Sequence, residues 1–192
     1  CRWSPHAHNE LLCAFANSNE LRTYDLGSNN PTKPSRVLRS SKAYAAGNGV
    51  ADVALPPHSN YLAAGGRDGQ LRIWDVRSRS ALVAQAEALT KSWTMGVRAQ
   101  DLRAGAISAL ALSAERNQLV SGSWDKSIKV WDLEAAHRLI RDTGARPRSA
   151  CCVRTLRYHT RAVMCLRLLP SGAFLSGGGD GRIILWEGHT DL

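Results

Sequence analysis

A short unit ending in tryptophan recurs along this chain and restricts its possible folds more than any other feature. The three clearest copies, which align without gaps, are Ala64–Asp75, Ser121–Asp132 and Ser176–Glu187. Each reads as a strand, a tight turn rich in Gly or Asp, and a second strand with alternating apolar residues. A weaker copy spans Ala14–Asp25, with Tyr24 in place of the tryptophan. Such repeats predict stacked copies of one small antiparallel sheet.

Each clear unit follows another short apolar segment, which we expect to form the first strand of its sheet. These segments are Val50–Leu55, Ile107–Leu112 and Val163–Leu168. Turn residues such as Pro56-Pro57 separate the segment from the unit that follows it. The basic element is therefore a three-stranded meander, repeated along the chain.

With these features the chain resembles the WD40 repeat family of β-propellers. The resemblance implies an all-β fold with about four blades, which together form one partial propeller domain. We place these blades at residues 1–44, 50–99, 106–157 and 162–192. Because the family usually closes a ring of seven blades, we expect this chain to be a fragment of a longer one. The absence of an initiator Met agrees with that expectation.

The tryptophans recur at intervals longer than the usual repeat of about 40–45 residues. The extra residues follow each Trp-containing strand, and we expect a fourth strand within each insertion. For the second blade, both Ala81–Ala86 and Trp93–Ala99 qualify as that strand. For the third blade we favour Cys152–Leu156.

The family braces its blades with a buried relay of His, Ser or Thr, Asp and Trp. The resemblance assigns to this relay His159, Ser176, Asp180 and Trp186 in the last blade, Ser121, Asp125 and Trp131 in the third, and Asp68 and Trp74 in the second. In the third blade Arg103 stands where the histidine would lie. Buried indole, imidazole and carboxylate groups all need hydrogen-bond partners, so we interpret the relay as structural rather than catalytic. The first blades should then depend more on packing.

Family members bind partners chiefly through loops at the rim of the central channel, and the residue before the turn aspartate points to one rim. The resulting candidate binding face consists of Arg67, Arg103, Trp124, Lys126 and Arg161. Exposed Trp and Arg side chains often dominate binding energies. The alternative is that Trp124 packs on the neighbouring blade and the cations are merely solvated.

A second candidate site is the segment Trp74-Asp75-Val76-Arg77, which resembles the WDxR box of substrate receptors in cullin-4 RING ubiquitin ligases. In those receptors the residues corresponding to Asp75 and Arg77 contact the adaptor protein. The third blade instead ends Trp131-Asp132-Leu133-Glu134, which lacks the arginine. The motif is short and arises by chance in many WD40 proteins.

Charge and cysteine content narrow the classes of partner and compartment. There are 25 Lys and Arg against 16 Asp and Glu, giving a net charge of +9. This excess favours acidic partner surfaces. The five cysteines form no CxxC pair, so we expect neither a zinc site nor a disulfide framework. We expect instead an intracellular protein whose thiols are reduced and mostly buried. No apolar run is long enough to cross a membrane.

The sequence has no phosphate-binding loop, nucleophile elbow or metal-ligand cluster. We therefore expect no enzyme activity, cofactor or small-molecule substrate. We predict a scaffold that binds proteins or peptides within a multi-subunit complex. The alternatives are a cullin-4 ligase receptor and a basic subunit of a ribonucleoprotein. Nucleic acid is the less favoured partner, because no aromatic stacking motif accompanies the basic residues.

Overall fold

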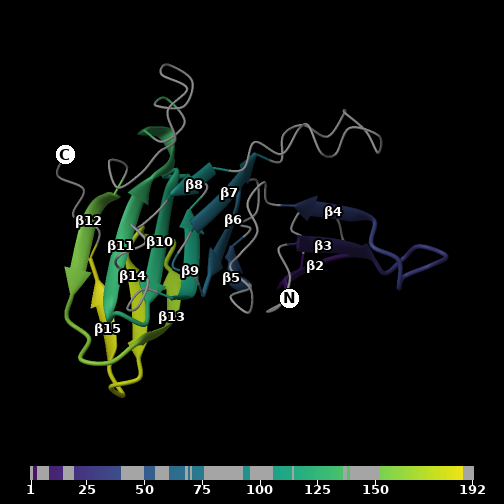
Figure 1. The fold of residues 1–192 in the computed structure, drawn as a ribbon. Helices are drawn as coiled ribbons and strands as arrows, with labels where there is room; N and C mark the ends of the chain where they lie inside the picture. Colours follow the sequence, from purple (N-terminus) through teal and green to yellow (C-terminus); the bar gives the residue numbers. More distant parts are fainter. Residues whose placement is uncertain are drawn as a thin grey trace.

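The computed structural model describes residues 2–3, 9–14, 20–39, 50–54, 61–67, 69, 71–75, 93–95, 106–113, 115–135, 138 and 152–187. These residues form four antiparallel sheets, in which strands adjacent in sequence are hydrogen-bonded neighbours (Figure 1). The first sheet contains β1 (Arg2–Trp3), β2 (Glu10–Ala14), β3 (Glu20–Asp25) and β4 (Arg36–Arg39). The second contains β5 (Val50–Ala54), β6 (Tyr61–Gly66), β7 (Leu71–Asp75) and β8 (Trp93–Met95).

The third sheet contains β9 (Ile107–Ser113), β10 (Gln118–Ser123), β11 (Ser127–Asp132) and β12 (Cys152–Arg157). The fourth contains β13 (Val163–Leu168), β14 (Phe174–Gly178) and β15 (Ile183–Trp186). We call these sheets blades 1 to 4. The fourth strand of blade 2 lies at Trp93–Met95, one of the two predicted segments, while Ala81–Ala86 lies outside the described residues.

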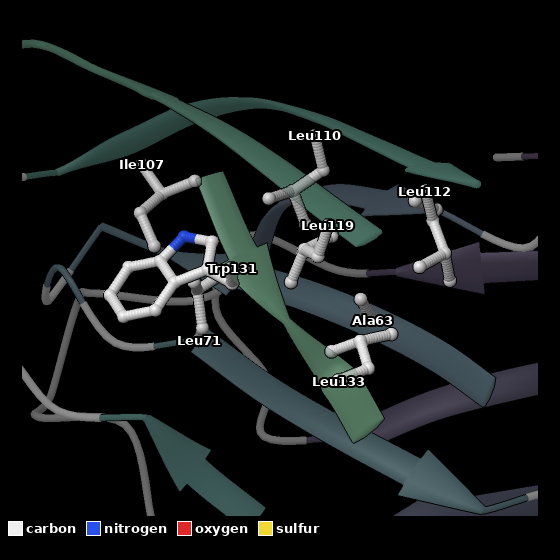
Figure 2. Packing of buried hydrophobic residues seen from close by; sticks show 9 residues of the cluster. Ala63, Leu71, Ile107, Leu110, Leu112, Leu119, Trp131 and Leu133 are labelled. Atoms are coloured by element: carbon white, nitrogen blue, oxygen red, sulfur yellow. The ribbon is translucent and has the colours of Figure 1, made fainter. Parts of the chain in front are cut away.

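The hydrophobic core of the described residues lies between successive blades, where the facing sheets pack on one another. Between blades 2 and 3, Trp131 and Leu119 meet Leu71 and Ala63 (Figure 2). Blades 1 and 2 meet through a smaller cluster that includes Leu21 and Leu62. A third cluster joins Val120, Ile128 and Val130 of blade 3 to Val163 and Phe174 of blade 4. The inner strands β5, β9 and β13 also contact one another in order.

Two glycines fix how closely neighbouring blades approach. A Cβ added to Gly65 would lie 2.4 Å from Ile107 Cγ2, and one added to Gly122 would lie 2.6 Å from Val163 Cγ1. Gly65 and Gly122 hold equivalent positions in β6 and β10, and Ile107 and Val163 both open the next inner strand. Each glycine therefore leaves a socket that the β-branched residue of the next blade fills.

The inner strands share an irregularity at one position. The register shifts in β5, β9 and β13 so that Ala51, Ser108 and Met164 each lack a paired residue. A bulge of this kind redirects the unpaired side chain. In blade 3 the Ser108 hydroxyl thereby reaches blade 4 and donates to the Val163 carbonyl.

Three cysteines belong to the described residues. Cys13 is buried, Cys152 is half-buried and Cys165 is exposed. The prediction of mostly buried thiols is therefore wrong for Cys165, whose face of β13 no described strand covers. Within the described residues, no helix combines the length and apolar character required to cross a bilayer.

Candidate functional site

The last blade contains a four-residue relay built on one buried hydroxyl. Trp186 Nε1 donates to Ser176 Oγ at 2.8 Å, and His159 Nε2 lies 2.8 Å from the same oxygen. On the other side of the imidazole, His159 Nδ1 lies 3.1 Å from both Asp180 carboxylate oxygens. The structure therefore brings together all four residues that the sequence assigned to this blade.

The direction of the relay follows from donor chemistry. An indole N–H can only donate, so Ser176 Oγ must accept from Trp186. In the neutral imidazole that donates Nδ1–H to Asp180, Nε2 is an acceptor, and the serine proton points to it. The Ser176 hydroxyl then accepts from Trp186 and donates to His159, and the residue is only 1% exposed. This burial and hydrogen bonding agree with the interpretation of His159, Ser176 and Asp180 as a structural brace.

Asp180 also accepts hydrogen bonds from two backbone N–H groups. Thr160 N–H donates to it at 2.8 Å and Arg182 N–H at 3.2 Å. Burial raises the pKa of the Asp180 carboxyl, but the hydrogen bonds from Thr160, His159 and Arg182 outweigh it and lower the pKa to about 2. Gly178 makes room for this pair, since an added Cβ would lie 2.3 Å from His159 Nδ1.

The third blade keeps half of this relay. Trp131 Nε1 donates to Ser121 Oγ at 2.9 Å. Asp125, however, accepts from the backbone and hydroxyl of Ser127 within its own hairpin. Ser123 stands where blade 4 has Gly178, and its hydroxyl donates to Ala106 O at 3.1 Å. A serine side chain thus occupies the place that blade 4 leaves open for its His–Asp pair.

The turns between the two middle strands build one rim of the blades. Trp124 N–H donates to Ala106 O at 2.9 Å, and Gly179 N–H donates to Ala162 O at 2.8 Å. In both blades the residue before the turn aspartate is thereby tied to the residue before the inner strand. The turn and the entry to the inner strand consequently form one continuous edge, which we call the rim.

Four predicted binding-face residues are described, and all are exposed. Arg67, Lys126 and Arg161 are exposed, and 63% of Trp124 is accessible to solvent. The alternative in which Trp124 packs on the neighbouring blade therefore does not hold. Arg103, the fifth residue of the predicted face, lies outside the described residues.

Lys126 adopts a conformation that favours glycine. Its φ is 73°, while Gly69 and Gly181 hold the equivalent turn positions with φ of 74° and 75°. A left-handed conformation costs a non-glycine residue about 1–2 kcal/mol. This strained residue lies two positions after the exposed Trp124, and such backbone strain is typical of functional positions.

Sequence reasoning missed two exposed residues at the same rim. Arg157 ends β12 opposite Ser127, and Tyr158 follows it with 61% of its surface exposed. The Tyr158 ring meets Trp186 edge-on at 6.5 Å between ring centroids. An aromatic residue directly before the relay histidine was the available signal. Among the described residues, Lys126, Arg157 and Arg161 have no ion-pair partner, and no cluster of three metal-ligating side chains occurs.

Comparison with known proteins identifies the repeat. The family model "WD domain, G-beta repeat" (WD40) matches residues 35–75, 99–132 and 150–187, more than half of the chain. The chain belongs to the WD40 repeat family.

Relatives and solved structures agree with this assignment. The chain is 27% identical to cell division cycle 20.1, cofactor of APC complex, of Arabidopsis thaliana, over 98% of the chain and 35% of the relative. It is 24% identical to Protein HIRA of Dictyostelium discoideum, over 79% of the chain and 13% of the relative. The chain thus spans well under half the length of either relative.

The chain is similar to the solved structure of U3-55K, and the similarity covers 95% of this chain and 46% of that one. The TM-score is 0.66 at 24% sequence identity. This likeness confirms the predicted all-β propeller fold, of which the described residues of this WD40 chain form four blades.

The remaining predicted residues of this WD40 chain cannot be placed in a site. Asp68, Arg77 and the side chains of Trp74 and Asp75 lie outside the described residues, although the backbone of β7 includes Trp74 and Asp75. The WDxR resemblance therefore stays a prediction from sequence.

Proposed function

We propose that this WD40 chain is a scaffold that holds protein partners within a multi-subunit complex, through the rim of blades 2 to 4. The observation that carries the proposal is Trp124, which is 63% exposed beside a strained Lys126. A large exposed aromatic side chain is a common anchor at protein interfaces. The proposed surface consists of Arg67, Trp124, Lys126, Arg157, Tyr158 and Arg161.

The charge of this surface favours partners with acidic patches. The two turn carboxylates of blades 3 and 4, Asp125 and Asp180, accept hydrogen bonds from their own blade and neighbouring loop. The nearby Lys126, Arg157 and Arg161 remain exposed. Complementary charge at such a surface accelerates association and fixes orientation.

The relatives support an assembly role without naming a partner for this chain. The Arabidopsis thaliana relative is described as a cofactor of a complex. Because the chain spans about a third of that protein, its partners do not transfer directly.

A comparative pull-down tests the proposal. Trp124→Ala should lose partners that the wild-type chain recovers, because the anchor contact is removed. Leu26→Ala is the matched control, since Leu26 is 46% exposed at the end of β3, away from the turn that joins β2 and β3. Full retention of every partner by Trp124→Ala would refute the proposed surface.

A further inference from the structure

The rim of blade 3 carries three side chains in a row that runs outward across the blade. Trp124 lies in the turn that follows β10, Lys126 directly precedes β11, and Arg157 ends β12. The strands of this blade are paired in the order β9, β10, β11, β12, and the Trp124 N–H is bonded to the Ala106 carbonyl just before β9. From the inner strand outward, the row therefore reads Trp124, Lys126, Arg157. We call it the radial row.

All three side chains of the radial row are exposed. Trp124 is 63% exposed, and among the described residues neither Lys126 nor Arg157 has an ion-pair partner. Asp125, which lies between Trp124 and Lys126 in the chain, accepts hydrogen bonds from the backbone and hydroxyl of Ser127 instead. The radial row thus presents one aromatic group followed by two cations to a partner.

The neighbouring blades do not repeat this combination. In blade 4, Gly179 and Gly181 hold the positions of Trp124 and Lys126, and in blade 2 the residue equivalent to Lys126 is Gly69. Glycine adopts the left-handed conformation of this turn position without strain, whereas Lys126 adopts it with φ of 73°. Strain at an exposed residue is typical of a position kept for binding.

The connection from β12 to β13 continues from the outer end of the radial row. Tyr158 in this connection is 61% exposed, and Arg161 is also exposed. The relay of blade 4 holds the connection in place, since the Thr160 N–H donates to the Asp180 carboxylate at 2.8 Å. A partner over blade 3 therefore meets an ordered surface, and a surface that is already ordered lowers the entropic cost of binding.

The spacing of the radial row matches an extended peptide that lies across the strands. Neighbouring strands are about 4.8 Å apart, so the ends of β10 and β12 are separated by about 10 Å. Alternate residues of an extended peptide face the same side and lie about 7 Å apart. With one residue over Trp124, the residue two positions away comes within reach of Lys126. The residue four positions away comes within reach of the long Arg157 side chain.

We propose that the radial row binds an extended acidic segment of a partner protein. The segment carries an aromatic or large aliphatic residue against Trp124, and Asp or Glu two and four positions away, against Lys126 and Arg157. The apolar contact supplies affinity, and the two charge pairs fix the register. This inference rests on the proposed rim function and narrows it to one blade and one sequence pattern.

Two peptides of identical composition and charge test the register. The probe is a fluorescent peptide with the core Phe-Ser-Glu-Ser-Glu, and the control has the order Glu-Ser-Phe-Ser-Glu. With its phenylalanine over Trp124, the control directs only one carboxylate towards the two cations. In anisotropy titrations against the full chain, we expect the control to bind about fivefold to tenfold more weakly, as expected for the loss of one charge pair at an interface.

A variant of the outer cation tests which carboxylate it contacts. Arg157→Ala should weaken binding of the probe by about the same factor. It should not change the affinity of the peptide Phe-Ser-Glu-Ser-Gln, which lacks the outer carboxylate. Because Arg157 is exposed, the variant should keep the wild-type melting temperature.

A glycine variant separates binding from folding at the strained lysine. Lys126→Gly should weaken binding of both peptides that carry the inner carboxylate, yet raise the melting temperature by about 2–4 °C because the strain is relieved. Lys33→Ala is the matched control, since it removes the same charge from an exposed position in the connection between β3 and β4. It should leave the affinity of the probe unchanged.

The outcomes distinguish the radial row from the wider rim function. Equal affinity of the two peptide orders, equal weakening of the Glu-ended and Gln-ended peptides by Arg157→Ala, or no binding of the probe would overturn the radial row. The rim function would still stand if Trp124→Ala lost partners in the pull-down. Displacement of the probe by oligouridylate, together with indifference to peptide order, would show a general polyanion site and would also overturn the proposal.

Discussion

Among the described residues, the equivalent serines of blades 3 and 4 have different numbers of side-chain hydrogen-bond partners. Ser176 accepts from Trp186 and contacts His159, whereas Ser121 accepts from Trp131. The sequence alignment of the repeats places these serines at the same position. Their different hydrogen-bonding loads follow from the presence of a histidine in blade 4.

Replacing these serines by alanine should therefore have unequal effects. Ser176→Ala leaves two polar groups without a partner and should lower the free energy of unfolding by about 2–6 kcal/mol, since each such group costs about 1–3 kcal/mol. Ser121→Ala leaves the Trp131 indole N–H without this acceptor and should lower the free energy of unfolding by about half as much. Urea unfolding of both variants measures the difference, and equal losses would show that His159 gains nothing from Ser176.

The low pKa of Asp180 predicts a pH-dependent loss of stability. Its folded-state pKa of about 2 lies below the ordinary 3.8, because hydrogen bonds to the ionised form outweigh burial. Ionised Asp180 therefore stabilises the fold fully above about pH 4, and this contribution disappears as the pH falls towards about 2. The melting temperatures of wild type and Asp180→Asn should differ near neutral pH and converge over this range. A difference that is independent of pH would contradict the relay.

At the scale of elements, the junctions between blades depend on side chains that fill glycine sockets. Gly122→Ala would place a methyl group against Val163, which is fully buried. Overpacking of this kind costs about 1–3 kcal/mol. Val163→Ala removes the clashing atoms, so the double variant should lose less stability than the two single changes combined. Thermal unfolding of the four proteins gives this coupling, and strict additivity would show that the two blades do not meet here.

The hairpins were predictable because their signals are local. Turn residues and alternation placed the strand pairs β6–β7, β10–β11 and β14–β15 where the structure has them. The bulge at Ala51, Ser108 and Met164 was not predictable, since it depends on how the next inner strand packs.

In the relay, too, sequence patterns did not predict every contact of a single residue. The sequence pattern assigns Asp125 and Asp180 one role, yet Asp125 turns to Ser127. Blade 3 has Arg103 at the histidine position, and Ser123 stands where Gly178 leaves space for His159 in blade 4. Comparing the repeats with one another, rather than with a consensus, could have shown this exchange.

At the scale of the whole molecule, the net charge of +9 and the exposed cations of the rim act together. A long-range field of this sign accelerates the approach of acidic partners and is screened over about 8 Å at physiological salt. Short-range anchoring by Trp124 should instead govern dissociation. The two contributions can therefore be separated kinetically.

Salt dependence then distinguishes a protein partner from a nucleic acid. For a protein partner recovered with the wild-type chain, a Lys126→Ala/Arg161→Ala variant should associate more slowly and lose most of its salt sensitivity. Its dissociation rate should change less than that of Trp124→Ala. For single-stranded RNA, each lost phosphate contact would reduce the slope of log affinity against log salt by about 0.7. We expect the wild-type chain to bind RNA weakly at physiological salt, with an affinity that Trp124→Ala does not change. Tight RNA binding whose slope falls stepwise with each rim cation removed would instead identify nucleic acid as the partner of this surface.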